Sequence, residues 1–288
     1  MRIVGPLCMT MVVGARAMST RSVGLSEVQA AASRIRSAAL APALVTPLLR
    51  SDLIDEMAGC SVAFKSEHLQ RTGSFKYRGA LNSVLCLDDD KAAAGVVGHS
   101  SGNHGAALAA AAQSRRIPCT VVVPQGTPAA KIANMERYGS RVVVCEPTQR
   151  ARTDTSAQIA AETGATFVHP YNDRTVIAGQ GTIGLEICEQ LGEEVDAVLV
   201  PTSGGGMVSG IAAAVRARLP HARVIACEPE GKRLGDALTA RERVLDASTA
   251  NEALRTVADA IRTQALGEIP WQMCSDERLL DDVVLSVT

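Results

Sequence analysis

Short runs of β-branched and other apolar residues alternate with longer alanine-rich stretches through the middle of this chain. The short runs predict strands and the alanine-rich stretches predict helices. We expect strands at 95–97, 120–123, 141–145, 165–168, 197–200 and 223–226, and helices at 106–113, 129–138, from about 146 to 163, and 207–219. Strict alternation of strand and helix is typical of parallel sheets covered by helices on both faces. The pattern therefore predicts an α/β protein, with two sheets.

Length and charge restrict the classes of protein further. A chain of 288 residues suggests about two domains at ~150 residues each. A net charge of −1 gives no sign of a nucleic-acid or anionic-membrane partner. No run approaches the ~20 apolar residues of a membrane span. We therefore expect a protein that acts on a small molecule.

The cysteines and the N-terminus bear on the compartment. Eight cysteines are scattered singly, without a Cys-x-x-Cys pair or zinc-ligand spacing, which favours reduced thiols in a reducing compartment. Residues 1–24 contain Arg2, Arg16 and Arg21 but no acid, a weak likeness to an organellar transit peptide. We interpret this segment as a dispensable extension and expect a cytoplasmic protein, with organellar targeting as the alternative.

One lysine stands out as candidate chemistry. Lys76 lies among small residues between Gly73 and Ala80, in a chain that has only five lysines. A desolvated lysine can become a neutral amine and attack a carbonyl, whereas arginine cannot lose its proton at ordinary pH. Taken alone, the segment favours a surface lysine in a turn, and the loops further along the chain change this interpretation.

Two loops follow predicted strands, where ligands gather in such folds. The loop from His99 to Gly105 combines small residues with hydroxyl, amide and imidazole groups, and the loop from Pro201 to Met207 contains three consecutive glycines. Consecutive glycines can turn several backbone amides toward one phosphate. Neither the nucleotide P-loop spacing nor the dinucleotide Gly-x-Gly-x-x-Gly pattern is present. The alternatives are a polar strand-to-helix turn for the first loop and a tight turn without a ligand for the second. A reactive lysine together with a phosphate site indicates pyridoxal phosphate, whose aldehyde forms a Schiff base with lysine.

Four ordered motifs resemble one known family: the fold-type II pyridoxal-phosphate enzymes, and within it the serine racemases and threonine/serine dehydratases. The motifs are 66–80, 99–105, 178–182 and 203–207. The resemblance implies a large discontinuous domain of residues 25–94 and 173–288, a small domain of residues 95–172, and a homodimer. Members of the family continue past the position of Thr288, so the C-terminal part of the large domain is expected to be missing.

The resemblance also implies roles for individual residues. Lys76 would hold the cofactor through a Schiff base and act as a base on one face of the substrate. The cofactor would be bound by Phe75, Lys76, Asn103, Ser203, Gly204, Gly205, Gly206 and Met207, and the substrate carboxylate by Ser100, Ser101, Asn103, His104 and Arg152.

Ser101 decides between two activities. Racemisation needs acid/base groups on both faces of the substrate Cα, and Ser101 would serve opposite Lys76. Many dedicated threonine dehydratases have alanine at this position. We therefore expect racemisation of serine with elimination to pyruvate and ammonia. The alternatives are a threonine dehydratase, forming 2-oxobutanoate and ammonia, and a truncated non-catalytic homologue.

The expected divalent-metal site departs from the family pattern. It would begin at Glu228, but Lys232 and Leu234 occupy the later positions, where the family has a carbonyl ligand and an aspartate. Loss of a carboxylate weakens a Mg²⁺ or Ca²⁺ site severely. We expect Lys232 to supply the positive charge and the protein to be indifferent to Mg²⁺ or Ca²⁺. A solvated surface lysine and a shifted site that uses Asp236 are the alternatives.

Overall fold

The computed structural model describes residues 22–243, 254, 256–263, 265–275 and 279–286. Most of the expected N-terminal extension and Cys8 therefore lie outside the described residues. The helices are α1 (Leu25–Arg36), α2 (Asp52–Ala58), α3 (Lys76–Leu85), α4 (Asp89–Ala94), α5 (Asn103–Arg115), α6 (Ala129–Arg137), α7 (Gln149–Thr163), α8 (Arg174–Leu191), α9 (Gly206–Arg218), α10 (Leu234–Ala240) and α11 (Glu268–Ser275). The strands are β1 (Leu48–Leu49), β2 (Phe64–Lys65), β3 (Val96–His99), β4 (Cys119–Pro124), β5 (Arg141–Cys145), β6 (Thr166–Phe167), β7 (Ala197–Pro201), β8 (Arg223–Pro229) and β9 (Asp282–Ser286).

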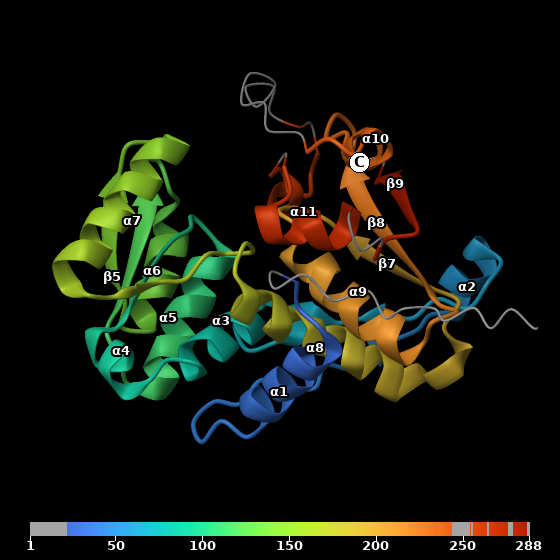
Figure 1. Cartoon of the computed structure of the whole chain (residues 1–288), viewed down its shortest axis with the longest axis horizontal. Coiled ribbons are helices and arrows are strands. Elements are labelled where there is room, and N and C mark those ends of the chain that lie inside the picture. The colour runs from blue at the N-terminus through green and yellow to red at the C-terminus, as the bar shows by residue number, and fades with distance from the viewer. Residues whose placement is uncertain (1–21, 244–253, 255, 264, 276–278, 287–288) are drawn as a thin grey trace, which may run out of the picture.

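Two parallel sheets form the two lobes visible in Figure 1. The first sheet has the strand order β5-β4-β3-β6, and α5 and α7 pack against it. Its centre is fully buried, with Val121 and Val123 packed among the alanines of α5. Strand β3 ends at His99, so the loop that follows opens at the carboxyl edge of this sheet.

The second sheet has the order β7-β8-β9, also parallel. Val198 and Val200 of β7 are buried in a cluster with α9, which begins at Gly206, within the glycine loop. Leu199 points the other way and is 60% exposed. In the described part of the chain, helix packing on β7 is therefore one-sided, which differs from the expected cover on both faces.

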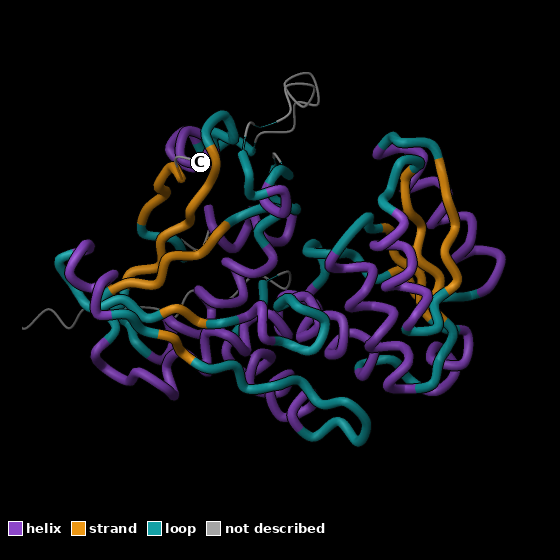
Figure 2. Tube along the Cα trace, turned by 180° about the vertical axis from the view of Figure 1, so that it is seen from behind, coloured by secondary structure: helices purple, strands orange, loops and turns teal. Residues whose placement is uncertain are grey.

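Helices α1, α3, α8 and α9 pack against one another; α9 also contacts β7 and β8 of the second sheet, and α3 contacts α5 of the first lobe (Figures 1 and 2). Their backbones approach closely at glycines: a Cβ built on Gly179 would lie 2.6 Å from the carbonyl oxygen of Arg78 on α3. A Cβ built on Gly210 of α9 would lie 2.6 Å from the amide nitrogen of Gly181 on α8. Motif 178–182 therefore serves helix packing beneath the site.

Several elements were not predicted from the pattern, among them α1, α3, α8 and the antiparallel pair β1–β2. The four-stranded sheet lies within residues 96–167, inside the predicted small domain, but the domain boundaries stay a prediction. None of the described helices is both long enough and apolar enough to span a membrane. The seven described cysteines are free thiols.

Candidate active site

Lys76 is the first residue of α3, preceded by Phe75 in the N-cap position. Its Nζ donates a hydrogen bond to the carbonyl oxygen of Pro170, 2.8 Å away, and lies 5.1 Å from the centre of the Phe75 ring. Among the described residues, no carboxylate forms an ion pair with this amine. The alternative of a surface lysine in a turn is wrong.

Burial changes the proton affinity of this amine. Desolvation lowers the pKa of Lys76 from 10.5 to about 8. Part of the residue still faces the open cleft, but Nζ itself is surrounded by protein, so loss of hydration dominates. A large fraction of Lys76 is therefore a neutral amine near pH 8, the form that can attack an aldehyde or accept a proton.

The serine loop lies between β3 and α5. Ser100 accepts a hydrogen bond at Oγ from the amide of Gly102, 3.1 Å away. Ser101 is half-buried, and its hydroxyl makes no hydrogen bond to any described residue. Asn103 is exposed at the first position of α5, where backbone N–H groups have no partner within the helix. The loop thus presents a hydroxyl, an amide side chain and the N-terminus of a helix, which suit an anionic group.

His104 is held differently from the other members of this loop. It is 3% exposed, and its Nε2 lies 3.1 Å from the carbonyl oxygen of Val168, to which it donates. Nδ1 is buried and has no hydrogen-bond partner among the residues that the structure describes. Burial lowers the pKa of His104 to about 3, so the ring is neutral with an unprotonated Nδ1. The contact of His104 with a substrate carboxylate stays a prediction. The backbone amide of His104 suits that contact better than its neutral ring, whose Nε2 already donates to Val168.

The glycine loop begins directly after β7. Gly205 has φ +90°, which favours glycine, and α9 starts at Gly206. The first N–H groups of α9, including those of Gly206 and Met207, have no partner within the helix. Ser203 is half-buried and Gly204 is buried. Small residues and unpaired amides at a helix N-terminus fit a phosphate group.

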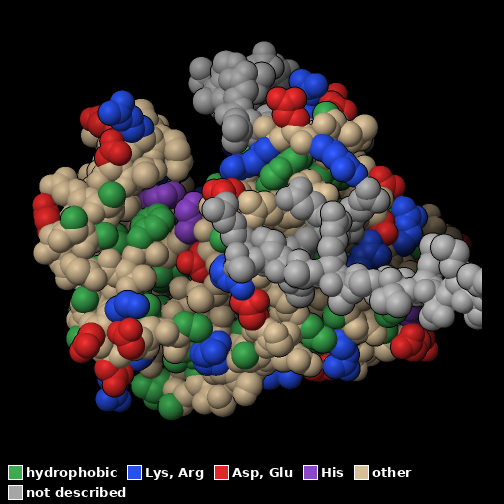
Figure 3. All heavy atoms as spheres, viewed as in Figure 1, with side chains coloured by type: hydrophobic (Ala, Val, Ile, Leu, Met, Phe, Trp, Pro, Cys, Tyr) green, Lys and Arg blue, Asp and Glu red, His purple; other side chains and the backbone are tan. Residues whose placement is uncertain are grey.

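The segment 169–172 brings the lysine and both loops together. Pro170 accepts from Lys76, while Tyr171 covers the glycine loop so closely that a Cβ on Gly206 would lie 2.9 Å from the Tyr171 carbonyl oxygen. His169 accepts at Nδ1 from the amides of Tyr171 and Asn172, at 3.3 and 2.9 Å. Burial lowers the pKa of His169 to about 4, which keeps this acceptor available. Histidine side chains are visible in the cleft between the lobes in Figure 3.

The sequence did not predict a role for segment 169–172. Its His-Pro-Tyr-Asn composition, between a strand and the N-cap Asp173, was the available signal. The rings of His99 and His169 are 6.1 Å apart, so this segment also contacts the end of β3.

Arg152 lies on α7 in the small lobe. Its Nε donates to the carbonyl oxygen of Thr148, 3.4 Å away. After desolvation, the charge of Arg152 is the second cause of the lowered pKa of His99, which places the guanidinium near the end of β3. The arrangement is compatible with the predicted carboxylate contact.

Glu228 and Lys232 form two separate contacts instead of a metal centre. Glu228 is 2% exposed and accepts from the amides of Leu234 and Gly235, at 2.9 and 3.3 Å, at the N-terminus of α10. Burial raises the pKa of Glu228. No cluster of three or more His, Cys, Asp or Glu side chains suited to a metal occurs among the described residues. The residues around Glu228 therefore do not fit a divalent cation in this arrangement, while indifference to Mg²⁺ stays a prediction.

The residues around Lys76 do fit pyridoxal phosphate. A buried amine without a carboxylate partner in the described structure suits an aldehyde, and the glycine loop with the start of α9 suits a phosphate. Phe75 is half-buried and packs, like Met207, against the cluster beneath β7 and β8. These residues would hold the cofactor between the two lobes.

Comparison with known proteins gives a consistent result. Residues 41–287 match the family model described as pyridoxal-phosphate dependent enzyme. Serine racemase of Arabidopsis thaliana is 46% identical over 239 residues, which cover 83% of this chain and 70% of that protein. The β-hydroxyaspartate dehydratase of Paracoccus denitrificans is 46% identical over 226 residues, which cover 78% of this chain and 70% of that protein. The structure of maize serine racemase superposes with a TM-score of 0.85 at 38% identity, covering 92% of this chain and 77% of that one.

Proposed function

Because this chain belongs to the family of pyridoxal-phosphate dependent enzymes, we propose that it interconverts L- and D-serine and also dehydrates serine to pyruvate and ammonia. The relatives named serine racemase support the substrate. The observation that carries the proposal is the convergence of Lys76, the serine loop and the glycine loop on segment 169–172.

Bound pyridoxal phosphate supplies an electron sink that stabilises negative charge at the substrate Cα. The N-terminus of α5 and Arg152 bind and orient the substrate carboxylate. Neutral Lys76 Nζ accepts the Cα proton on one face, and Ser101 Oγ exchanges a proton on the other face. Loss of the β-hydroxyl as water needs only Lys76, which can pass the proton taken from Cα to the departing oxygen.

Replacement of Ser101 tests this division of labour. In the Ser101→Ala variant we expect formation of D-serine from L-serine to fall by at least ~10²-fold, the usual contribution of one acid/base group. Release of pyruvate should persist in part, because Lys76 remains. Chiral chromatography and a coupled pyruvate assay measure the two reactions. Ser114→Ala, at the far end of α5, should leave both unchanged. An equal loss of both reactions in Ser101→Ala would contradict the assigned roles.

The relative from Paracoccus denitrificans supports a second candidate, dehydration of β-hydroxyaspartate. Turnover of L-serine, L-threonine and 3-hydroxyaspartate under the same conditions separates these substrates. Turnover of any of them also eliminates the non-catalytic alternative.

We further propose that the chain forms a homodimer. Helix α2 and the adjacent strand pair β1–β2 offer an exposed apolar surface for it.

A further inference from the structure

A buried lysine outside the reaction itself holds the glycine loop. Lys232 is 2% exposed and follows β8 in the turn before α10. Its Nζ donates to the main-chain carbonyl oxygens of Thr202 and Ser203, the latter at 2.6 Å. These carbonyls directly precede Gly204. The alternative of a solvated surface lysine is therefore wrong.

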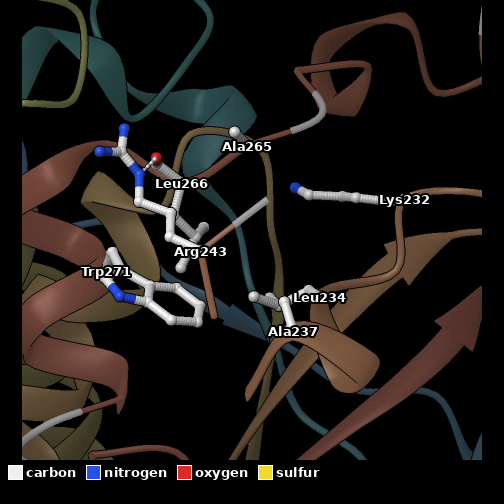
Figure 4. A pocket seen from close by; sticks show the side chains of 7 residues that line it. All are labelled: Lys232, Leu234, Ala237, Arg243, Ala265, Leu266 and Trp271. Carbon is white, nitrogen blue, oxygen red and sulfur yellow. Dashed lines mark hydrogen bonds between the residues drawn. The ribbon is translucent and has the colours of Figure 1, made fainter. Parts of the chain in front are cut away.

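The surroundings leave this ammonium few other partners. Lys232 borders a small pocket whose remaining lining residues are Leu234, Ala237, Arg243, Ala265, Leu266 and Trp271 (Figure 4). Burial lowers the pKa of Lys232 to about 8 against the attraction of Glu228, so the amine is mostly protonated at pH 7. The Glu228 carboxylate itself accepts from the amides of Leu234 and Gly235. Hydrogen bonds from a charged donor are roughly twice as strong as neutral ones. The two carbonyls are thus firmly oriented.

Orienting a carbonyl also orients the next N–H group. The peptide unit is planar and trans, so the C=O of one residue and the N–H of the next point in opposite directions. When Lys232 holds the carbonyls of Thr202 and Ser203 on one side, the N–H groups of Ser203 and Gly204 face the other side. The ammonium also adds positive charge behind these donors.

We propose that Lys232 is a positioning residue for the cofactor phosphate: it sets the direction of the first amides of the glycine loop. This inference rests on the proposed role of residues 203–207 in binding the phosphate. In this proposal Lys232 supplies the positive charge that a divalent cation would supply in the family's metal site. Leu234 occupies the position of the aspartate ligand, so no carboxylate is available there for a cation.

Binding of pyridoxal phosphate to the Lys232→Met variant tests the proposal. We expect the dissociation constant to rise at least ~10-fold, or about 1.4 kcal/mol. The ³¹P resonance of the bound phosphate should shift, because its donors move. At saturating cofactor the visible absorbance that depends on Lys76 should return. Lys91→Met, at an exposed lysine on α4, is the matched control and should bind as the wild type does. An unchanged dissociation constant and ³¹P shift, even with a lower melting temperature, would mean a merely structural role and overturn the proposal.

Two further variants keep the test decisive if Lys232→Met does not fold. Lys232→Arg keeps the charge, and Lys232→Gln keeps a donor without charge, so we expect affinity to fall from wild type through arginine to glutamine. Equal affinity in all three proteins would overturn the proposal.

Mg²⁺ should change neither the affinity nor the melting temperature of the wild type. Strong stabilisation by Mg²⁺ would overturn the assignment of the charge to Lys232. A wild-type protein that binds no cofactor would defeat the proposed function itself, a result distinct from all of these.

Discussion

At the residue scale, Lys76 combines a buried amine with an open cleft. The folded protein lowers its pKa to about 8, whereas the unfolded chain has the ordinary value of 10.5. Between these pH values the unfolded chain binds more protons than the folded chain, so the contribution of Lys76 to stability becomes more favourable as pH rises. Below pH 8 the buried charge opposes folding by up to about 3 kcal/mol, reduced by water in the cleft.

The Lys76→Met variant of the cofactor-free protein should therefore be more stable than the wild type at pH 7, by about 1–3 kcal/mol. The difference should shrink as pH rises from 8 toward 10.5, because the folded lysine is then neutral and the cost of burying its charge falls away as the unfolded lysine also loses its proton. Urea unfolding at pH 7, 8.5 and 10 measures it, with Lys91→Met as the exposed control. A difference that does not change with pH would contradict the buried-amine interpretation.

At the element scale, glycines set the distance between α8 and α9. Alanine usually stabilises a helix by about 1 kcal/mol relative to glycine. Gly210→Ala should instead destabilise the protein by about 2–3 kcal/mol, because its Cβ would meet the backbone of Gly181. The control is Gly235→Ala in α10, whose Cβ would meet Val283 at an ordinary 3.6 Å. Thermal unfolding compares the two, and equal melting temperatures would show that the helices can move apart.

The bounds of helices and strands are predicted correctly where the local pattern of apolar residues determines the structure. Strand β5 coincides with the predicted 141–145, and α6 ends within a residue of the predicted 138. Helix α8 was not predicted, because its glycines are weak helix formers and only the close contact with its neighbours compensates. Lys76 and both loops could be selected from the sequence, because a lysine among small residues and runs of glycine or serine are visible without knowledge of the fold. The contact of Tyr171 with the glycine loop, and that of Lys232 with its carbonyls, depend on elements far apart in sequence.

At the scale of the whole molecule, one surface is unusually apolar. Helix α2 has no buried residue, and Leu53 and Met57 on it are 65% and 79% exposed. Leu49 and Phe64 of the adjacent strand pair are 48% and 47% exposed. Exposed apolar patches of this kind mark protein interfaces.

Substitution on this apolar surface tests the proposed homodimer. We expect the wild type to have a dimer mass in light scattering and Met57→Glu to shift toward monomer, because a charge would be buried in the interface. Val144→Glu, at an exposed apolar residue on the edge strand β5, should leave the mass unchanged. A monomeric wild type, or an equal effect of both substitutions, would contradict the proposed interface.

The start of α9 at Gly206 lies against Tyr171, and His104 in the first turn of α5 bonds to Val168, the residue before segment 169–172. Each helix N-terminus carries partial positive charge and unpaired amides. Before the cofactor arrives, these same groups attract any small oxyanion in solution. We therefore expect inorganic phosphate and sulfate to compete with the cofactor for these amides, so that a purification buffer free of both favours uptake of the cofactor.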